Sequence, residues 1–91
     1  MKLNFEKVKF YRGVSKKDTF EQDIREQFAD IMYQTANGVA ALTLAQKIYS
    51  SEGETEYSEM EVSIIRQTAE LCTPQLIDAV SGMIDNYNIN K

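Results

Sequence analysis

The chain has 91 residues, 43% of them apolar, and a formal net charge of −4. This length suits one small domain and leaves too little chain for a second hydrophobic core. No stretch reaches the roughly 18 uncharged apolar residues that a membrane span needs, and the N-terminus lacks the apolar run of a secretory signal. The sequence therefore predicts a cytoplasmic protein without a membrane segment, in agreement with a lone cysteine that cannot form an internal disulfide.

The first predicted element is a β-strand in which the alternation of apolar and charged residues slips. Leu3 and Phe5 share one parity, whereas Val8 and Phe10 share the other. A β-bulge near residues 6–7 would bend the strand so that all four side chains face one core. The alternative is a strand that is covered on both faces.

A turn at residues 13–18 follows, and it predicts a hairpin that returns through residues 19–22. Thr19 and Gln22 also have the spacing of a helix capping box, so a helix start at this point is the alternative. From Ile24 onward the apolar residues recur with a helical period, which predicts an amphipathic helix that ends near Gly38.

A second, shorter helix is predicted to begin at Thr43, which forms a capping box with Gln46. Its inward face would consist of Leu44, Ala45, Ile48 and Tyr49. Residues 54–57 then predict a short edge strand that lies beside the N-terminal strand.

Two further helices complete the predicted fold. Ser58 and Glu61 form a capping box for the first, whose apolar face includes Met60, Ile65 and Leu71. Thr73 and Pro74 have the pattern of an N-cap followed by the first helical residue of the second. We expect an α+β fold in which a basic strand or hairpin (residues 1–22) packs on a helical body (residues 23–87), with a frayed tail at residues 88–91.

No motif for catalysis, a metal or a cofactor is found. The chain has no histidine, so an imidazole-activated nucleophile is excluded, and the four scattered glycines form neither a P-loop nor a dinucleotide-binding fingerprint. An EF-hand loop with Gly53 at its sixth position would need Ile48 as its first ligand, which rules that loop out. The sequence indicates a non-enzymatic protein.

Charge is distributed unevenly along the chain. Residues 1–17 hold six basic residues and one acid, whereas residues 18–91 hold four basic residues and thirteen acids. The first segment, the basic head, could contact the phosphates of nucleic acid, but its lysines could equally protect an edge strand. The candidate phosphate contacts are Lys2, Lys7, Lys9 and Arg12.

Two other surfaces are candidate interaction sites. Five carboxylates lie close together in one segment, which we call the acidic run. We expect it to bind either a basic surface of a partner protein or the basic head. The last helix carries an apolar stripe that is either core or a contact between two copies of the chain. The acidic run consists of Glu52, Glu54, Glu56, Glu59 and Glu61, and the stripe consists of Ile77, Val80, Ile84 and Tyr87.

The order of elements resembles that of small uncharacterised proteins encoded by bacteriophages, prophages and related mobile elements. The features that carry the resemblance are a lysine-rich N-terminal strand ending in Tyr11 and Arg12, the segment LTLAQKIY at residues 42–49, the acidic turn and a last helix entered through Pro74. The resemblance implies an accessory role, such as phage assembly or inhibition of a host factor, and no catalytic residues. The leading hypothesis is a self-associating protein that binds an unidentified protein, and the alternative is a nucleic-acid-binding module that uses the basic head.

Overall fold

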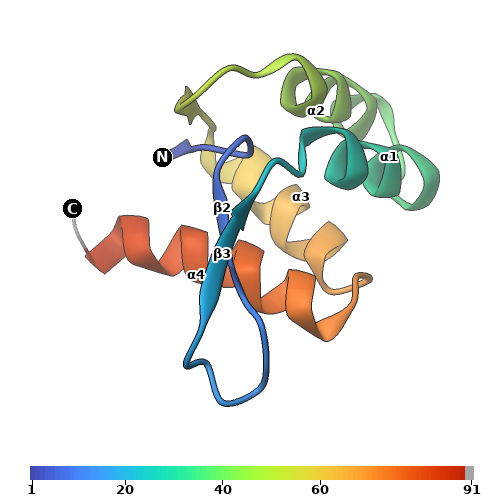
Figure 1. Cartoon of the computed structure of the whole chain (residues 1–91). Helices are drawn as coiled ribbons and strands as arrows, with labels where there is room; N and C mark the ends of the chain where they lie inside the picture. The colour runs from blue at the N-terminus through green and yellow to red at the C-terminus, as the bar shows by residue number, and fades with distance from the viewer. Residues whose placement is uncertain (90–91) are drawn as a thin grey trace.

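Two short antiparallel strand pairs and four helices form the chain, which has the expected α+β class (Figure 1). The computed structural model describes residues 1–89. In chain order the elements are β1 (Lys2–Leu3), β2 (Val8–Tyr11), β3 (Thr19–Gln22), α1 (Arg25–Thr35), α2 (Val39–Ser50), β4 (Thr55–Glu56), α3 (Glu59–Ala69) and α4 (Pro74–Ile89).

The slip in the N-terminal alternation is a turn between two strands, so the expected β-bulge is wrong. The side chain of Asn4 accepts a hydrogen bond from the amide of Glu6 at 3.0 Å, and the Asn4 carbonyl accepts one from the amide of Lys7 at 3.4 Å. Asparagine favours such turns because its side chain can replace a backbone acceptor. This turn changes the direction of the chain, and the apolar side chains on either side of it are all buried: Leu3, Phe5, Val8 and Phe10.

Each strand on either side of that turn pairs with a different segment. β1 pairs with β4 and places Lys2 opposite Glu56, which confirms the edge strand predicted beside the N-terminus. β2 pairs with β3 and places Phe10 opposite Phe20, so residues 19–22 are a strand and not a helix start. The N-terminal segment therefore joins two separate sheets.

Two helices begin where their capping residues predict. The hydroxyl of Ser58 accepts from the amide of Glu61 at 3.1 Å, and the carboxylate of Glu61 accepts from the amide of Ser58 at 2.8 Å, which forms the predicted capping box of α3. Pro74 is the first residue of α4, as predicted, and the amide of Leu76 donates to the hydroxyl of Thr73 at 3.4 Å.

The start of α2 differs from its prediction. The helix begins at Val39, four residues before Thr43, and Gly38 enters it with a φ of +93° and no side-chain cap. A positive φ of this size is accessible mainly to glycine, so the helix start depends on backbone conformation at Gly38 and not on a capping hydroxyl. The expected inward face is also partly wrong, because the side chain of Tyr49 is 59% exposed.

One hydrophobic core lies between the helices and the two sheets. The Phe5 ring is fully buried in this core. It stacks on the ring of Phe28 with 5.4 Å between the ring centroids, and it makes an edge contact with the ring of Tyr57 with 5.7 Å between the centroids. Met60 of α3 and Leu71, which lies in the turn after α3, are however about two-thirds exposed, contrary to the predicted inward face. The frayed tail was predicted to begin at residue 88, but α4 continues to Ile89. Residues 90–91 of the predicted tail lie outside the described part of the chain.

Candidate functional site

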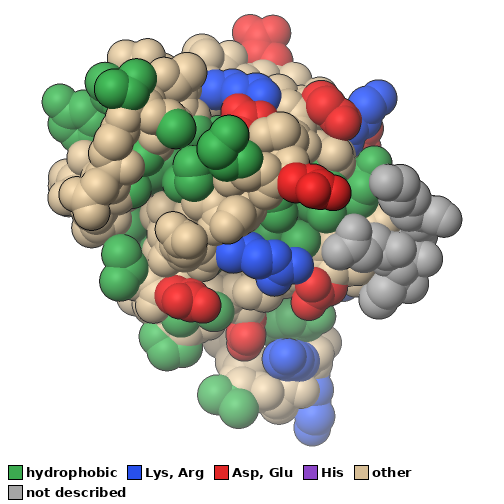
Figure 2. Space-filling view, turned by 180° about the vertical axis from the view of Figure 1, so that it is seen from behind, with side chains coloured by type: hydrophobic (Ala, Val, Ile, Leu, Met, Phe, Trp, Pro, Cys, Tyr) green, Lys and Arg blue, Asp and Glu red, His purple; other side chains and the backbone are tan. Residues whose placement is uncertain are grey.

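The hairpin of β2 and β3 carries a concentration of positive charge. Among the described residues, none of its five cations forms an ion pair, although several carboxylates elsewhere in the chain do. Figure 2 shows basic side chains at the lower end of the molecule, where the hairpin tip lies. We call the five residues the hairpin cations: Lys7, Lys9, Arg12, Lys16 and Lys17.

Several of the hairpin cations lie over aromatic rings of the same hairpin. The ammonium groups of Lys9 and Lys16 lie 5.9 and 5.3 Å from the centre of the Tyr11 ring. The guanidinium of Arg12 lies 4.9 Å from the centre of the Phe20 ring, whose centroid is 5.4 Å from that of Phe10. Such contacts attract a cation to the negative face of the ring and stay compatible with exposure to solvent.

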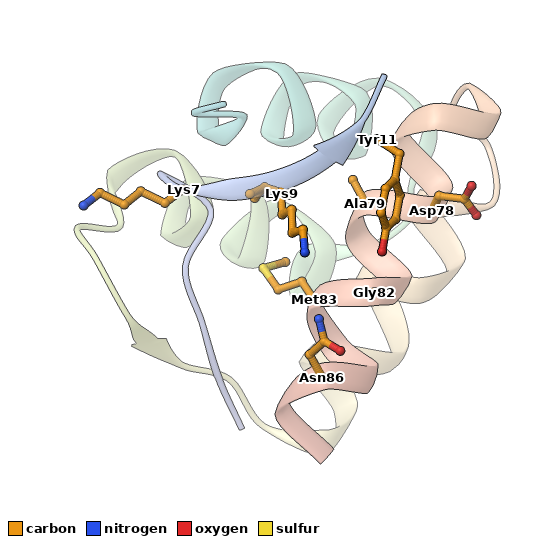
Figure 3. Close-up of a pocket in the computed structure, with 9 residues that line it drawn as sticks. Lys7, Lys9, Tyr11, Asp78, Ala79, Gly82, Met83 and Asn86 are labelled. Carbon is orange, nitrogen blue, oxygen red and sulfur yellow. The ribbon is translucent and has the colours of Figure 1, made fainter. Parts of the chain in front are cut away.

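A groove runs along the line where β2 meets α4, and it consists of two hollows of about 220 and 320 Å³ that share Tyr11 and Asp78. In Figure 3 the side chains of Lys9 and Tyr11 extend toward α4, whereas Lys7 points away. Gln75 of α4 donates to the carbonyl of Tyr11 at 2.8 Å and thereby fixes the spacing of the two walls. We call this feature the β2–α4 groove.

The basic head is therefore divided by the fold. Lys7, Lys9 and Arg12 all lie at the β2–α4 groove, although the side chain of Lys7 is directed away from α4. Lys2 is in the other sheet, opposite Glu56. Of the predicted nucleic-acid contacts, three share one surface and the fourth does not. Sequence reasoning missed the α4 wall, because only the tertiary structure brings Asp78 and Gly82 to the strand.

The acidic run does not form one free surface. Glu61 accepts from the ammonium of Lys47 at 3.0 and 3.2 Å, and Glu56 accepts from the N-terminal ammonium at 3.0 Å. Burial raises the pKa of Glu61, but the Ser58 amide and the Lys47 ammonium together outweigh that effect and lower it below its usual value. The three remaining members, Glu52, Glu54 and Glu59, are exposed.

The apolar stripe of the last helix is mostly core. Val80 and Ile84 have no exposed surface, so they cannot contact a second copy, and the prediction of a self-association surface is corrected at these positions. Ile77 and Tyr87 are half-buried. The stripe packs against the rest of its own chain because α4 lies along β2 and α3 (Figure 1).

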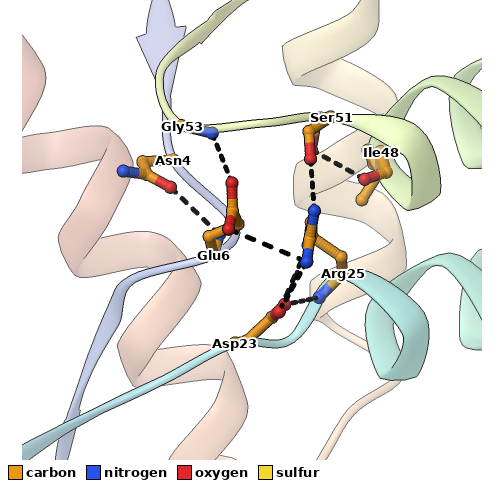
Figure 4. A network of polar contacts seen from close by, with 7 residues as sticks. All are labelled: Asn4, Glu6, Asp23, Arg25, Ile48, Ser51 and Gly53. Atoms are coloured by element: carbon orange, nitrogen blue, oxygen red, sulfur yellow. Dashed lines mark hydrogen bonds and ion pairs between the residues drawn. The ribbon is translucent and has the colours of Figure 1, made fainter.

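The most connected polar cluster has a structural role (Figure 4). Glu6 accepts from the amide of Gly53 at 2.6 Å and lies 3.7 Å from Arg25. Arg25 also donates to the carbonyl of Ser51 at 2.7 Å and pairs with Asp23 at 2.9 Å, and the hydrogen bond from Arg25 lowers the pKa of Asp23. The cluster joins three loops, and its charged groups are already satisfied by one another.

The described residues contain no group of three or more potential metal ligands, and none of their helices has the length and apolarity to cross a membrane. Burial raises the pKa of the Cys72 thiol, which donates to the carbonyl of Thr68 at 3.4 Å, so the protonated form of this thiol is favoured. Comparisons with protein-family models, curated proteins and solved structures find no match to this chain.

Proposed function

We propose that the chain is a non-enzymatic protein that binds an acidic segment of another protein in the β2–α4 groove. The observation that carries this proposal is the set of hairpin cations, which have no ion-pair partner in the described part of a chain whose net charge is −4. An acidic segment would supply the missing negative charge. Complementary charge of this kind accelerates association and selects among partners.

A binding role is supported over catalysis by the contacts of the carboxylates whose pKa is shifted, even though Asp23 lines a hollow of about 340 Å³. Catalytic carboxylates typically have shifted pKa values and face a cleft. Here the carboxylates with a lowered pKa are Asp23 and Glu61, and each is occupied by a structural contact with Arg25 or Lys47. Their shifts thus reflect the stability of the fold.

A protein segment is favoured over nucleic acid by the state of the aromatic rings. Strand-based readers of single-stranded nucleic acid stack bases on open aromatic faces. On this hairpin Tyr11 lies against Lys9 and Lys16, and Phe20 lies against Arg12 and Phe10, so a base would have to displace these contacts.

The proposal fits an accessory role for a mobile element, as the sequence resemblance implies. A phage assembly factor or an inhibitor of a host factor acts by binding another protein and needs no catalytic group. Either role would present the hairpin to an acidic surface.

Binding of a fluorescein-labelled decaglutamate peptide, measured by fluorescence anisotropy at low salt, tests this function. We expect binding that weakens as salt is added and that falls about tenfold on Lys9→Glu. The control is Lys2→Glu, which makes the same charge change in β1, outside the groove. We expect its affinity to stay within about twofold of the unmodified protein.

Three results would overturn the proposal. The first is a lack of peptide binding at low salt, and the second is an equal loss of affinity in the two variants. The third is a preference for an oligothymidine of equal charge over the peptide, which would assign the groove to nucleic acid. Circular dichroism spectra of both variants verify that neither substitution unfolds the chain.

A further inference from the structure

The solvent-facing side of α2 has no charged residue, which is unusual in a chain of which 26% is charged. The one charged residue of the helix, Lys47, is turned toward α3, where it pairs with Glu61. The exposed residues of the helix are Val39, Ala40, Leu42, Thr43, Gln46, Tyr49 and Ser50.

Four of these residues form a regular stripe. Val39, Leu42, Gln46 and Tyr49 follow one another at intervals of three, four and three residues, which is the spacing of the contact positions in a coiled coil. Val39 is 78% exposed, Leu42 40% and Tyr49 59%. We call this row the α2 stripe.

The apolar surface extends from the α2 stripe onto α1. Tyr33 of α1 is 70% exposed and lines a shallow hollow of about 200 Å³ together with Ala45, Gln46 and Tyr49 of α2. Figure 2 shows hydrophobic side chains on the left of the molecule, over the end that contains α1 and α2. The hollow could accept an apolar side chain from a partner.

The two ends of the α2 stripe carry opposite electrostatic character. At Val39 the helix begins with no side-chain cap and no acid in its first turn, so its free amide groups leave a partial positive charge there. At the other end the acidic residue Asp30 lines the same hollow as Tyr49. An antiparallel copy of the same surface would bring each Asp30 to the open helix start of the other copy.

We propose that the α2 stripe is the contact surface of a symmetric dimer. A second copy packs antiparallel on the stripe, with Val39 opposite Tyr49 and Leu42 opposite Gln46, and Asp30 caps the partner's helix. A two-fold contact requires a surface that is complementary to itself, and the α2 stripe meets this condition. Two copies that each carry −4 also repel one another least where they meet through the exposed side of α2, which has no charged residue.

Size-exclusion chromatography with light scattering, over a range of concentrations up to tens of micromolar, tests the dimer. We expect twice the mass of 10.4 kDa for the unmodified chain and the single mass for Val39→Glu, which places a charge opposite Tyr49 and Asp30 of the partner. Glutamate in the first turn suits the dipole of α2, so this variant stays folded. The control is Val14→Glu at the exposed hairpin tip, an identical substitution that should leave the dimer intact.

Asp30→Asn tests the antiparallel arrangement separately. The substitution makes each copy less negative, so general repulsion alone predicts a tighter dimer. The proposed capping contact predicts a dimer that is about threefold weaker or more, since each dimer loses two such contacts. A tighter or unchanged dimer overturns the antiparallel arrangement, and a single mass for the unmodified chain, or equal dissociation of Val39→Glu and Val14→Glu, overturns the α2 interface.

Discussion

Replacing Lys47 with methionine removes one charge that holds three elements together while it preserves most of the aliphatic stem. The ammonium of Lys47, on α2, donates to the carbonyl of Glu56 at 2.7 Å and to the carboxylate of Glu61 at 3.0 Å. It also lies 4.6 Å from the centre of the Tyr57 ring. The variant therefore loses contacts with β4, with α3 and with a buried aromatic ring at once.

The size of the loss follows from these contacts. The hydrogen bond to the Glu56 carbonyl contributes about 1 kcal/mol. The ion pair with Glu61 contributes about 0.5 kcal/mol, because the Lys47 side chain is 34% exposed and solvent screens the charges. The cation–π contact adds about 0.5 kcal/mol. We expect the free energy of unfolding to fall by about 2 kcal/mol, which lowers the melting temperature by about 8–16 °C in a domain of this size.

Urea unfolding followed by circular dichroism measures this change, with thermal unfolding as a second reading. The matched control is Arg66→Met, which breaks an ion pair with Asp85 whose two side chains are 46% and 61% exposed. That pair is worth less than about 0.5 kcal/mol. Equal losses in the two variants, or a larger loss in Arg66→Met, would refute the assignment of Lys47 as a tertiary contact.

Three further changes test other parts of the fold. Tyr57→Phe should raise the free energy of unfolding by about 1 kcal/mol in urea titrations, because the buried Tyr57 hydroxyl has no hydrogen bond of good geometry within residues 1–89; a loss of stability would mean that the hydroxyl bonds to Ser51 or Thr55. The lowered pKa of Glu61 stabilises the fold above the ordinary value of 4.5, and this contribution is lost as the pH falls through the lowered pKa. Unfolding titrations from pH 6 to about pH 3 should therefore show a shallower loss of stability for Glu61→Gln than for the unmodified chain, and parallel curves would contradict this. Gly38→Ala should cost about 1 kcal/mol in thermal unfolding because its φ of +93° strains any residue with a Cβ, whereas Gly82→Ala, at a helical glycine with open space around its Cβ position, should not destabilise the chain.

Local hydrogen-bonding patterns were the most predictable part of the fold. The Ser58 and Glu61 capping box and the Thr73 and Pro74 pair set the starts of α3 and α4 through side chains at most three residues apart in the sequence. The start of α2 was not predictable in this way, since it relies on the positive φ of Gly38. The turn at Asn4 could have been predicted, because the side chain of asparagine commonly accepts a hydrogen bond from the amide two residues further on. The alternation of apolar residues in the flanking strands suggested one bent strand instead.

The candidate site was predictable only on one side. The lysines of the hairpin stand out in the sequence, yet the α4 wall depends on a contact between residues that are more than sixty positions apart, such as Tyr11 and Gln75. For the acidic run, the sequence predicted one free surface, but tertiary contacts within the chain engage Glu56 and Glu61. Charge in a sequence identifies the candidates, but the internal partners of each charge emerge only from the fold.

The hairpin tip and α2 lie at different ends of the molecule, low and high in Figure 1. A dimer formed through the α2 stripe would consequently direct its two basic hairpins away from the dimer axis. Such a pair would be bivalent: after one hairpin had bound an acidic segment, the second would search for a neighbouring segment at a raised effective concentration. Bivalent attachment of this kind can strengthen binding by about 10²–10⁴, so a weak individual contact would suffice on a target that repeats its acidic surface.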